Sequence, residues 1–238
     1  MRAALSFLTP FGGARPPGPS TFDWFPVVGA AIGLALGGLW WVAVRAWPTP
    51  VAAAVVVAAD LAVTGMLHFD GLVDSADGLL APMATGRRLA VMADPGVGAF
   101  GLAVGGTILL VRWAALSALH PGILLVAGLW CLSRTAMAVV ARSQPYVRGE
   151  HGLARAFEGR ARGGRRWIWL GAGVVVGGAL LAGWRVVPGL ASGGAAVVAA
   201  AAVAALARRR IGGFTGDVLG ASGVLAETAG LLVAAARW

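Results

Sequence analysis

Charged residues are scarce in this sequence. Only 12% of its 238 residues are charged, 58% are hydrophobic, and the mean hydropathy is +0.81. A soluble domain carries roughly twice that share of charge, so the composition argues against a water-soluble globular protein. It indicates an integral membrane protein instead, which we expect to form one membrane domain over residues 1–238.

Cysteine is nearly absent and lysine is absent. The single Cys131 excludes an intramolecular disulfide and a metal site built from several thiolates. All nineteen basic residues are arginines, and with ten acids they give a net charge of +9. In a soluble protein this charge would suggest nucleic-acid binding. In a membrane protein arginines are first expected to mark one side of the bilayer, so no nucleic-acid partner is predicted.

Long apolar stretches alternate with short polar ones along the chain. A helix needs about 20 residues to cross the hydrocarbon core of a bilayer. We therefore predict an all-α polytopic bundle of about seven transmembrane helices, or six because the last two stretches are only weakly hydrophobic. The predicted spans are Val27–Val44, Val51–Leu67, Gly96–Leu119, Ile123–Ala141, Trp167–Val187, Leu190–Ala207 and Val218–Ala236.

The arginines sort to one side of this map. With a cytoplasmic N-terminus, fourteen of the nineteen fall in the cytoplasmic segments 1–24, 68–95, 142–166 and 208–217. Basic residues favour the cytoplasmic side of a membrane, so the asymmetry predicts this orientation. Eight of the ten acids lie in or beside the same segments. The polar chemistry is therefore expected at the cytoplasmic face.

The densest polar cluster runs from His68 to Gly78. Asp70, Asp74 and Asp77 are spaced i, i+4, i+7, so on a helix that continues the second span they share one face. Carboxylates this close repel one another unless a cation lies between them, and hard oxygen ligands suit Mg²⁺. His68 is a candidate base or metal ligand. The alternative is a solvated acidic loop, which has no reason to place its acids on one helical face.

Candidate phosphate ligands follow this cluster. Arg88 comes first, and Asp94 then opens the glycine-rich turn 95–101, which leads into the third span. Glycines let the backbone approach a ligand, and the start of a helix favours an anion. Because Mg²⁺ in proteins is often shared with substrate phosphates, these features together predict a pyrophosphate site.

Two further segments are candidates for substrate binding. Gly212–Asp217 follows an arginine run that ends in Arg210, and it either cradles a phosphate or is a tight turn capped by Asp217. The arginine-rich stretch 142–166 either anchors the chain to anionic lipid or binds a charged substrate, with Arg148 among the preferred ligands.

Charged residues also fall inside the predicted spans. Asp60, Arg112, Arg134 and Glu227 are each costly there unless they are paired or face a polar cavity. Arg134 lies about 10 Å from the cytoplasmic end of its span, at a level that Asp60 can share. It either forms a structural ion pair with Asp60 or reaches a substrate phosphate.

Taken together, these motifs resemble the cobalamin synthase family, the adenosylcobinamide-GDP ribazoletransferases. The pattern His-x-Asp-Gly-x-x-Asp-x-x-Asp-Gly is specific, and Gly-Gly-x-Thr-Gly-Asp adds independent weight. The stretches that carry the resemblance occur in order from about residue 5 to 232: Phe25–Gly29, Thr64–Leu79, Arg88–Asp94, Ser133–Arg134, Gly152–Ala154 and Gly212–Gly220.

The resemblance implies a Mg²⁺-dependent transferase of the bacterial cytoplasmic membrane that acts late in cobalamin biosynthesis. Such an enzyme joins adenosylcobinamide-GDP to α-ribazole or its 5′-phosphate and releases GMP. On this reading Asp94 is the preferred base and His68 the second, beside a metal held by Asp70, Asp74 and Asp77. The expected substrate and phosphate ligands are Arg88, Arg134, Arg148, Arg210 and Asp217. A homo-oligomer is left open.

Two other functions are weighed against this one. CDP-alcohol phosphatidyltransferases share the signature Asp-x-x-Asp-Gly-x-x-Ala-Arg, which Asp74 to Ala81 satisfies until Pro82 replaces the arginine. Gly98 also stands where the last aspartate of that signature would fall. A membrane transporter would place its binding residues near the bilayer centre, whereas the dense motifs here lie at one face.

Overall fold

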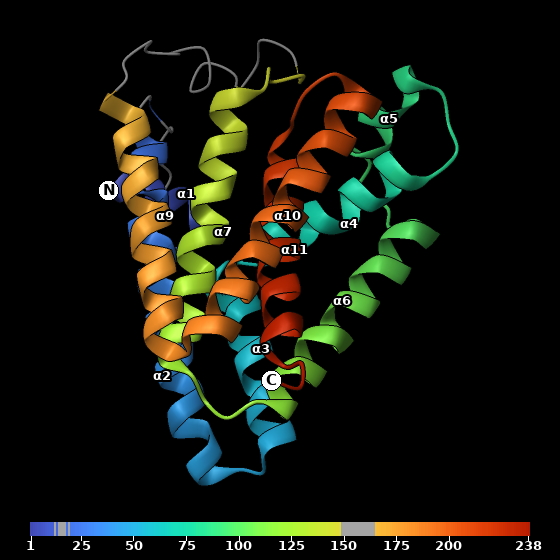
Figure 1. The fold of residues 1–238 in the computed structure, drawn as a ribbon. Coiled ribbons are helices and arrows are strands. Elements are labelled where there is room, and N and C mark those ends of the chain that lie inside the picture. The colour runs from blue at the N-terminus through green and yellow to red at the C-terminus, as the bar shows by residue number, and fades with distance from the viewer. Residues whose placement is uncertain (12, 14–17, 19, 149–164) are drawn as a thin grey trace.

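The structure, a computed structural model, describes residues 1–11, 13, 18, 20–148 and 165–238. This part of the chain is an all-α bundle (Figure 1). Its helices are α1 (Arg2–Leu8), η1 (Thr21–Trp24), α2 (Phe25–Ala46), α3 (Thr49–Val63), α4 (Leu67–Leu80), α5 (Thr85–Val91), α6 (Ala99–Ala118), α7 (Ile123–Ser143), α9 (Arg165–Trp184), α10 (Val186–Ile211) and α11 (Gly216–Ala234).

Six of these helices are long and apolar enough to cross a membrane, and the bent pair of α3 and α4 makes up to seven. The predicted all-α polytopic membrane bundle is therefore confirmed. Most predicted bounds lie within a few residues of the helix ends. The largest difference is in α10, which runs from Val186 to Ile211 and includes the arginine run at its end. Long arginine side chains can extend from a helix end toward water, so they do not have to end the helix.

The second predicted span is wrong in one respect. The helix ends at Val63, and the chain bends by 88° between α3 and α4. Gly65 and Met66 both take left-handed backbone angles, with φ of 57° and 60°. For a residue other than glycine this conformation costs roughly 1–2 kcal/mol, so surrounding contacts must hold the bend. The acidic cluster consequently lies on a separate helix, α4, and does not continue α3.

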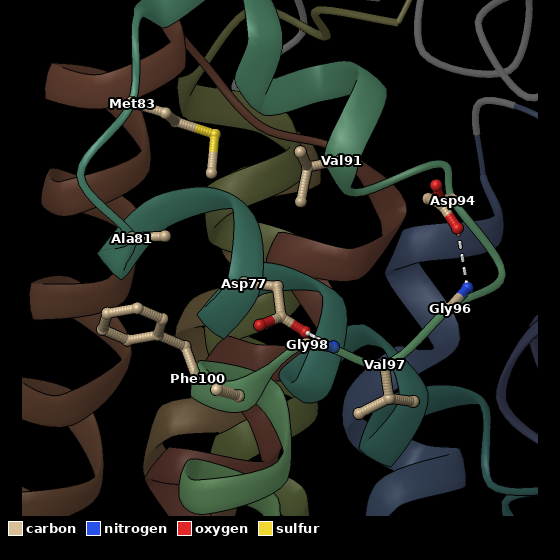
Figure 2. Close-up of a pocket in the computed structure, with 10 residues that line it drawn as sticks. Asp77, Ala81, Met83, Val91, Asp94, Gly96, Val97, Gly98 and Phe100 are labelled. Carbon is tan, nitrogen blue, oxygen red and sulfur yellow. Dashed lines mark hydrogen bonds between the residues drawn. The ribbon is translucent and has the colours of Figure 1, made fainter.

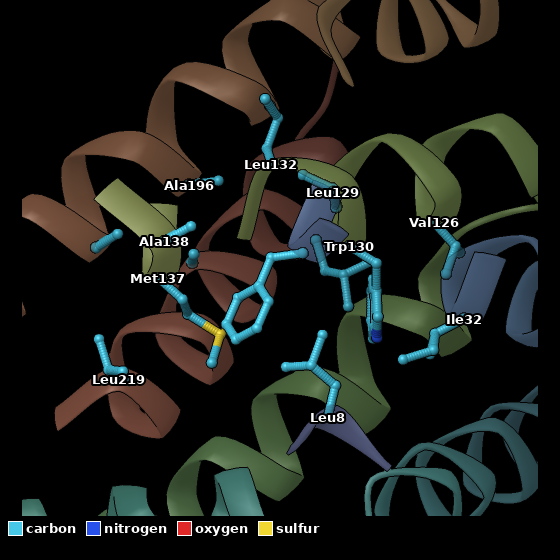
Figure 3. Packing of buried hydrophobic residues seen from close by; sticks show 14 of the residues in the cluster. Leu8, Ile32, Val126, Leu129, Trp130, Leu132, Met137, Ala138, Ala196 and Leu219 are labelled. Atoms are coloured by element: carbon cyan, nitrogen blue, oxygen red, sulfur yellow. The ribbon is translucent and has the colours of Figure 1, made fainter. Parts of the chain in front are cut away.

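Helix α7 is the central element of the bundle. It packs against α2, α9, α10 and α11, and most of its side chains are buried. Figure 3 shows Trp130, Leu132 and Met137 of this helix within the hydrophobic core. Arg134, in the buried part of α7, therefore faces protein on every side.

Glycines allow α2 to lie directly against α7. A Cβ at Gly33 would lie 2.6 Å from the Cα of Ala127, and one at Gly29 would lie 2.4 Å from the carbonyl oxygen of Trp130. Small residues at such a crossing let membrane helices approach closely and gain van der Waals contact. This contact fixes the first membrane helix against the centre of the bundle.

One end of the bundle gathers segments that are far apart in the sequence. Figure 1 shows α5, the ends of α7 and α10 and the starts of α9 and α11 at this end, while the C-terminus lies at the other. Helix α4 and the start of α6 lie toward the same end. The predicted polar motifs thus meet on one side of the molecule.

Candidate functional site

A short backbone bridge joins the segment after α7 to the start of α11. The N–H of Val147 donates to the carbonyl of Phe214 at 3.1 Å, and the N–H of Phe214 donates to that of Pro145 at 2.9 Å. A Cβ at Gly213 would lie 2.1 Å from the Pro145 oxygen, so a side chain there would prevent this approach. The bridge brings Arg148 next to the first turn of α11.

Tyr146 lies at the centre of this bridge and outside the membrane-spanning helices. Its ring packs edge-on against Phe214, with ring centroids 5.5 Å apart. Burial raises the pKa of Tyr146 above its ordinary value. The ring contact helps to hold the segment after α7 against the start of α11.

Asp217 stands at the start of α11 but does not cap it. Thr215 is the N-cap, because its Oγ1 accepts a hydrogen bond from the N–H of Val218 at 3.3 Å. Of the two alternatives for this segment, the turn capped by Asp217 is therefore wrong. The Asp217 carboxylate instead accepts a hydrogen bond from the Thr215 hydroxyl at 3.1 Å and pairs with Arg148 at 2.9 Å.

Helix α4 crosses α11 at backbone contact, and glycine makes this possible on both helices. A Cβ at Gly71 would lie 2.8 Å from the Cα and the carbonyl oxygen of Asp217. A Cβ at Gly220 would lie 3.0 Å from the Cα of His68. Because of this crossing, Asp217 lies beside the acids of α4.

The carboxylates of Asp70, Asp74 and Asp217 form what we call the acidic site. Asp74 experiences the negative charges of Asp70, Asp217 and, more weakly, Asp77, and the positive charge of Arg148. Asp70 is exposed, and the other two acids are partly exposed. Within the described ranges, no three His, Cys, Asp or Glu side chains already enclose a metal position. The carboxylates are oxygen donors of the kind that Mg²⁺ prefers, and Mg²⁺ stays a prediction.

Asp77 has a different role from the one its spacing predicts. It is buried, and its carboxylate accepts hydrogen bonds from the N–H groups of Gly98 at 2.8 Å and Gly101 at 2.9 Å. Figure 2 shows the bond from Gly98. A carboxylate at a helix start satisfies free N–H groups and complements the helix dipole. Asp77 therefore holds α6 against α4. Asp217 lies beside Asp70 and Asp74, in the place predicted for Asp77.

Arg88 is likewise a structural residue in this arrangement. Its guanidinium is buried and donates to carbonyl groups in the last turn of α4 and just after it. These acceptors are the carbonyl oxygens of Gly78, Leu79, Ala81 and Met83, at 2.7, 3.2, 3.1 and 2.8 Å. The prediction of Arg88 as a phosphate ligand loses its support, because its donors already satisfy the end of α4.

The two predicted bases do not lie in the acidic site. Asp94 is exposed at the rim of a pocket next to Asp77, and its Oδ1 accepts a hydrogen bond from the N–H of Gly96 at 2.8 Å. His68 is only 3% exposed, and neither ring nitrogen has a partner among the described residues. It precedes Asp70 by two positions, so the two side chains point to different sides of α4.

The charged residues inside the spans form a buried network. Arg112 pairs with Asp60 at 2.8 Å and with Glu227 at 3.2 Å, and Arg134 pairs with Glu227. The indole N–H of Trp130 donates to Asp60 at 3.0 Å. The predicted pair of Arg134 with Asp60 is therefore wrong. With 1% exposure and an acid partner, Arg134 has a structural role in place of substrate contact.

The remaining predicted ligands lie at the same end of the bundle. Arg210 is exposed on the last turn of α10, and its role as a phosphate ligand stays a prediction. Most of the arginine-rich stretch 142–166 lies outside the described residues, which omit 149–164.

Asp217 beside the acids of α4 is the contribution that sequence spacing alone misses. The sequence signal that could have found Asp217 is its motif, Gly212–Asp217. The predicted membrane map places that motif on the same side as the acids of α4.

Replacing Gly71 with alanine should destabilise the bundle at the α4–α11 crossing. The added methyl group would lie 2.8 Å from the Asp217 backbone, so the helices must separate at a cost of about 1–3 kcal/mol. Thermal unfolding of the purified protein in detergent measures this change. Gly106→Ala in α6 is the matched control, because a Cβ there meets nothing within 4 Å. Equal melting temperatures for the two variants would contradict the close crossing.

Comparisons with known proteins agree with this arrangement of motifs. The chain matches the family described as cobalamin-5-phosphate synthase over residues 1–235. Three similar proteins are each named adenosylcobinamide-GDP ribazoletransferase. The one from Chlorobaculum tepidum is 39% identical, over 91% of this chain and 85% of its own. That from Chlorobaculum parvum is 40% identical with the same coverage, and that from Ectopseudomonas mendocina is 35% identical over 98% and 97%. No solved structure matches.

Proposed function

The chain belongs to the cobalamin-5-phosphate synthase family, and on that premise we propose that it joins adenosylcobinamide-GDP to α-ribazole or α-ribazole 5′-phosphate. The observation that carries this proposal is the match over nearly the whole chain to transferases of this name. A ribose hydroxyl oxygen of ribazole that is free in both acceptors, and therefore not the 5′ oxygen, attacks the phosphorus that bears cobinamide. The bond from this phosphorus to the bridging oxygen breaks, GMP leaves with the electron pair, and the hydroxyl proton is released.

The acidic site suits a Mg²⁺ ion that is shared with the pyrophosphate of the substrate. Asp70, Asp74 and Asp217 are the residues that would hold it, because they present carboxylates from two crossing helices to one surface. When bound, such an ion would neutralise charge on the phosphate oxygens and orient the phosphate groups. Catalysis of phosphoryl transfer rests mainly on positioning and charge stabilisation, which these fixed groups supply.

Arg148 is the residue best placed to contact the phosphates beside the acidic site. It pairs with Asp217 at 2.9 Å, and it also donates to the carbonyl of Met92 at 2.7 Å. Its side chain is 33% exposed, so a ligand can reach the guanidinium. Contact with Asp217 and Met92 holds this cation between the start of α11 and the segment after α5.

We place the acidic site at the cytoplasmic face of a bacterial membrane. Fourteen of the nineteen arginines lie on this side of the predicted map, and basic residues favour the cytoplasm. The nucleotide half of the substrate is charged and water-soluble, so it would reach the acidic site without crossing the bilayer. The spanning helices hold this site at the membrane surface.

Purified protein given adenosylcobinamide-GDP and α-ribazole should release GMP and form adenosylcobalamin in equal amounts. Both products are measured by chromatography with mass detection. Removal of divalent cations with a chelator should stop the reaction, and added Mg²⁺ should restore it. Absence of both products would contradict the transferase. Full activity in the chelator would contradict only its metal dependence.

The same assay separates the other candidate functions. A CDP-alcohol phosphatidyltransferase would release CMP from a CDP-linked lipid precursor. A transporter would move a solute across vesicles without making either product. The buried charges that a transporter could use are paired with one another, which favours the transferase.

A further inference from the structure

A pocket of about 420 Å³ opens between the end of α4, α5 and the start of α6. Apolar side chains and two carboxylates line it, and Figure 2 shows them around the opening. The side chains that matter here are those of Asp77, Met83, Val91, Asp94, Val97 and Phe100. This composition suits a flat, partly polar ring system better than a phosphate, because apolar surfaces can cover its faces while carboxylates accept hydrogen bonds from its edge.

The pocket lies next to the acidic site. Asp77 follows Asp74 by three residues, which is about 4.5 Å along the helix axis. Arg148 connects the two places, because it pairs with Asp217 and donates to the carbonyl of Met92, two residues before Asp94. A nucleotide whose phosphates lie at the acidic site would therefore have its base within reach of this pocket.

Asp94 is the carboxylate that can recognise the edge of a base. Both oxygens of Asp77 accept backbone N–H groups of α6, whereas Asp94 is exposed at the rim. Its Oδ1 accepts the N–H of Gly96 at 2.8 Å, which fixes the orientation of the carboxylate. An ionised carboxylate has about four acceptor positions, so Asp94 can still accept two adjacent donors.

Guanine is the base that offers two adjacent donors. Its N1–H and its exocyclic N2 amine lie side by side, whereas adenine has an acceptor at N1 and hypoxanthine lacks the amine. We propose that the pocket binds the guanine of the nucleotide, with its ring against Phe100 and its N1–H and N2 amine donating to Asp94. This inference rests on the proposed function, which supplies a GDP-linked substrate, and it makes Asp94 a specificity residue.

Nucleotide competition tests the inference without a corrinoid. The purified full chain is titrated with a fluorescent GDP analogue, and GMP, IMP and AMP then compete for it. GMP should bind on the order of tenfold more tightly than IMP, because IMP lacks one charge-assisted hydrogen bond. Asp94→Asn should remove most of this preference, since it replaces one acceptor oxygen with an NH2 group that cannot accept from the base. Asp23→Asn is the control, because Asp23 pairs with Arg142 and does not line the pocket.

A second variant tests the base-stacking part of the inference. Phe100→Ala should weaken GMP, IMP and AMP by a similar factor, on the order of tenfold, because an aromatic face contacts any base. The ratio of GMP to IMP affinity should stay unchanged in this variant. An altered ratio with unchanged overall affinity would contradict the assignment of Phe100 to the ring face.

The outcomes separate this inference from the proposed function. If Asp94→Asn lowers kcat but keeps the preference for GMP over IMP, Asp94 acts as a base and the inference is wrong. Equal binding of the three nucleotides by the unmodified protein would also overturn it. Guanine-selective, Asp94-dependent binding by a chain that makes no cobalamin would support the pocket and contradict the transferase.

Discussion

Replacing Asp74 with asparagine is expected to lower the rate of GMP release by about a hundred- to a thousandfold while the protein still folds. Asp74 experiences the charges of Asp70 and Asp217, and asparagine keeps its shape but removes its charge. A cation shared with the pyrophosphate would then be held by fewer negative groups. The rate is measured over a range of Mg²⁺ concentrations, and the half-saturating concentration should rise.

The matched comparison is Asp77→Asn on the same helix. Asp77 accepts N–H groups of Gly98 and Gly101, so its loss should loosen the start of α6 and lower the melting temperature. The Mg²⁺ concentration needed for half-maximal rate should stay unchanged in this variant. If Asp77→Asn raises that concentration as much as Asp74→Asn does, Asp77 belongs to the metal site and the assignment of Asp217 is wrong.

The membrane fold could be predicted because its signals are local. Each crossing is a continuous apolar run, and the arginines mark the ends of those runs. The bend after Val63 could not be predicted, because Gly65 and Met66 lie in a continuous apolar stretch and Met66 takes a left-handed conformation that is rare for its type. Only packing around the bend can select such a conformation.

The acidic site could be predicted in part. The helical spacing of Asp70, Asp74 and Asp77 is real, since all three lie on α4. Spacing does not show what each carboxylate meets, and the start of α6 binds Asp77. The third carboxylate, Asp217, comes from a helix far along the chain, and Gly71 allows it to approach. These are tertiary contacts that no local pattern reports.

The predicted arginine ligands show the same limit. Arginines near a predicted phosphate site are natural candidates for phosphate ligands. The partners of a guanidinium in the folded chain, however, are set by distant residues. Arg88 binds four carbonyl oxygens at the end of α4. Arg134 pairs with Glu227, which lies 93 residues away. In both cases burial requires the charge to be satisfied within the protein.

Replacing Glu227 with glutamine is expected to destabilise the protein by about 3–5 kcal/mol, the cost of breaking a buried ion pair from one side. Glu227 is 1% exposed, pairs with both Arg112 and Arg134, and accepts a hydrogen bond from the hydroxyl of Ser133 at 2.8 Å. Without the charge of Glu227, Arg112 keeps Asp60 as its partner and Arg134 loses its ion pair, which leaves one more positive than negative charge in this network. The measurement is the temperature at which the purified protein loses its monodisperse peak in detergent.

The double variant Glu227→Gln with Arg134→Gln tests the cause of this loss. It removes one charge of each sign and restores neutrality, so part of the lost stability should return even though the ion pair is gone. If the double variant is less stable than the sum of the two single changes predicts, the packing of these side chains, and not their charge, determines the stability of this part of the core. If Glu227→Gln is as stable as the unmodified protein, Glu227 carries no charge in the folded bundle. Its ion pairs would then not hold α6 and α7 against α11.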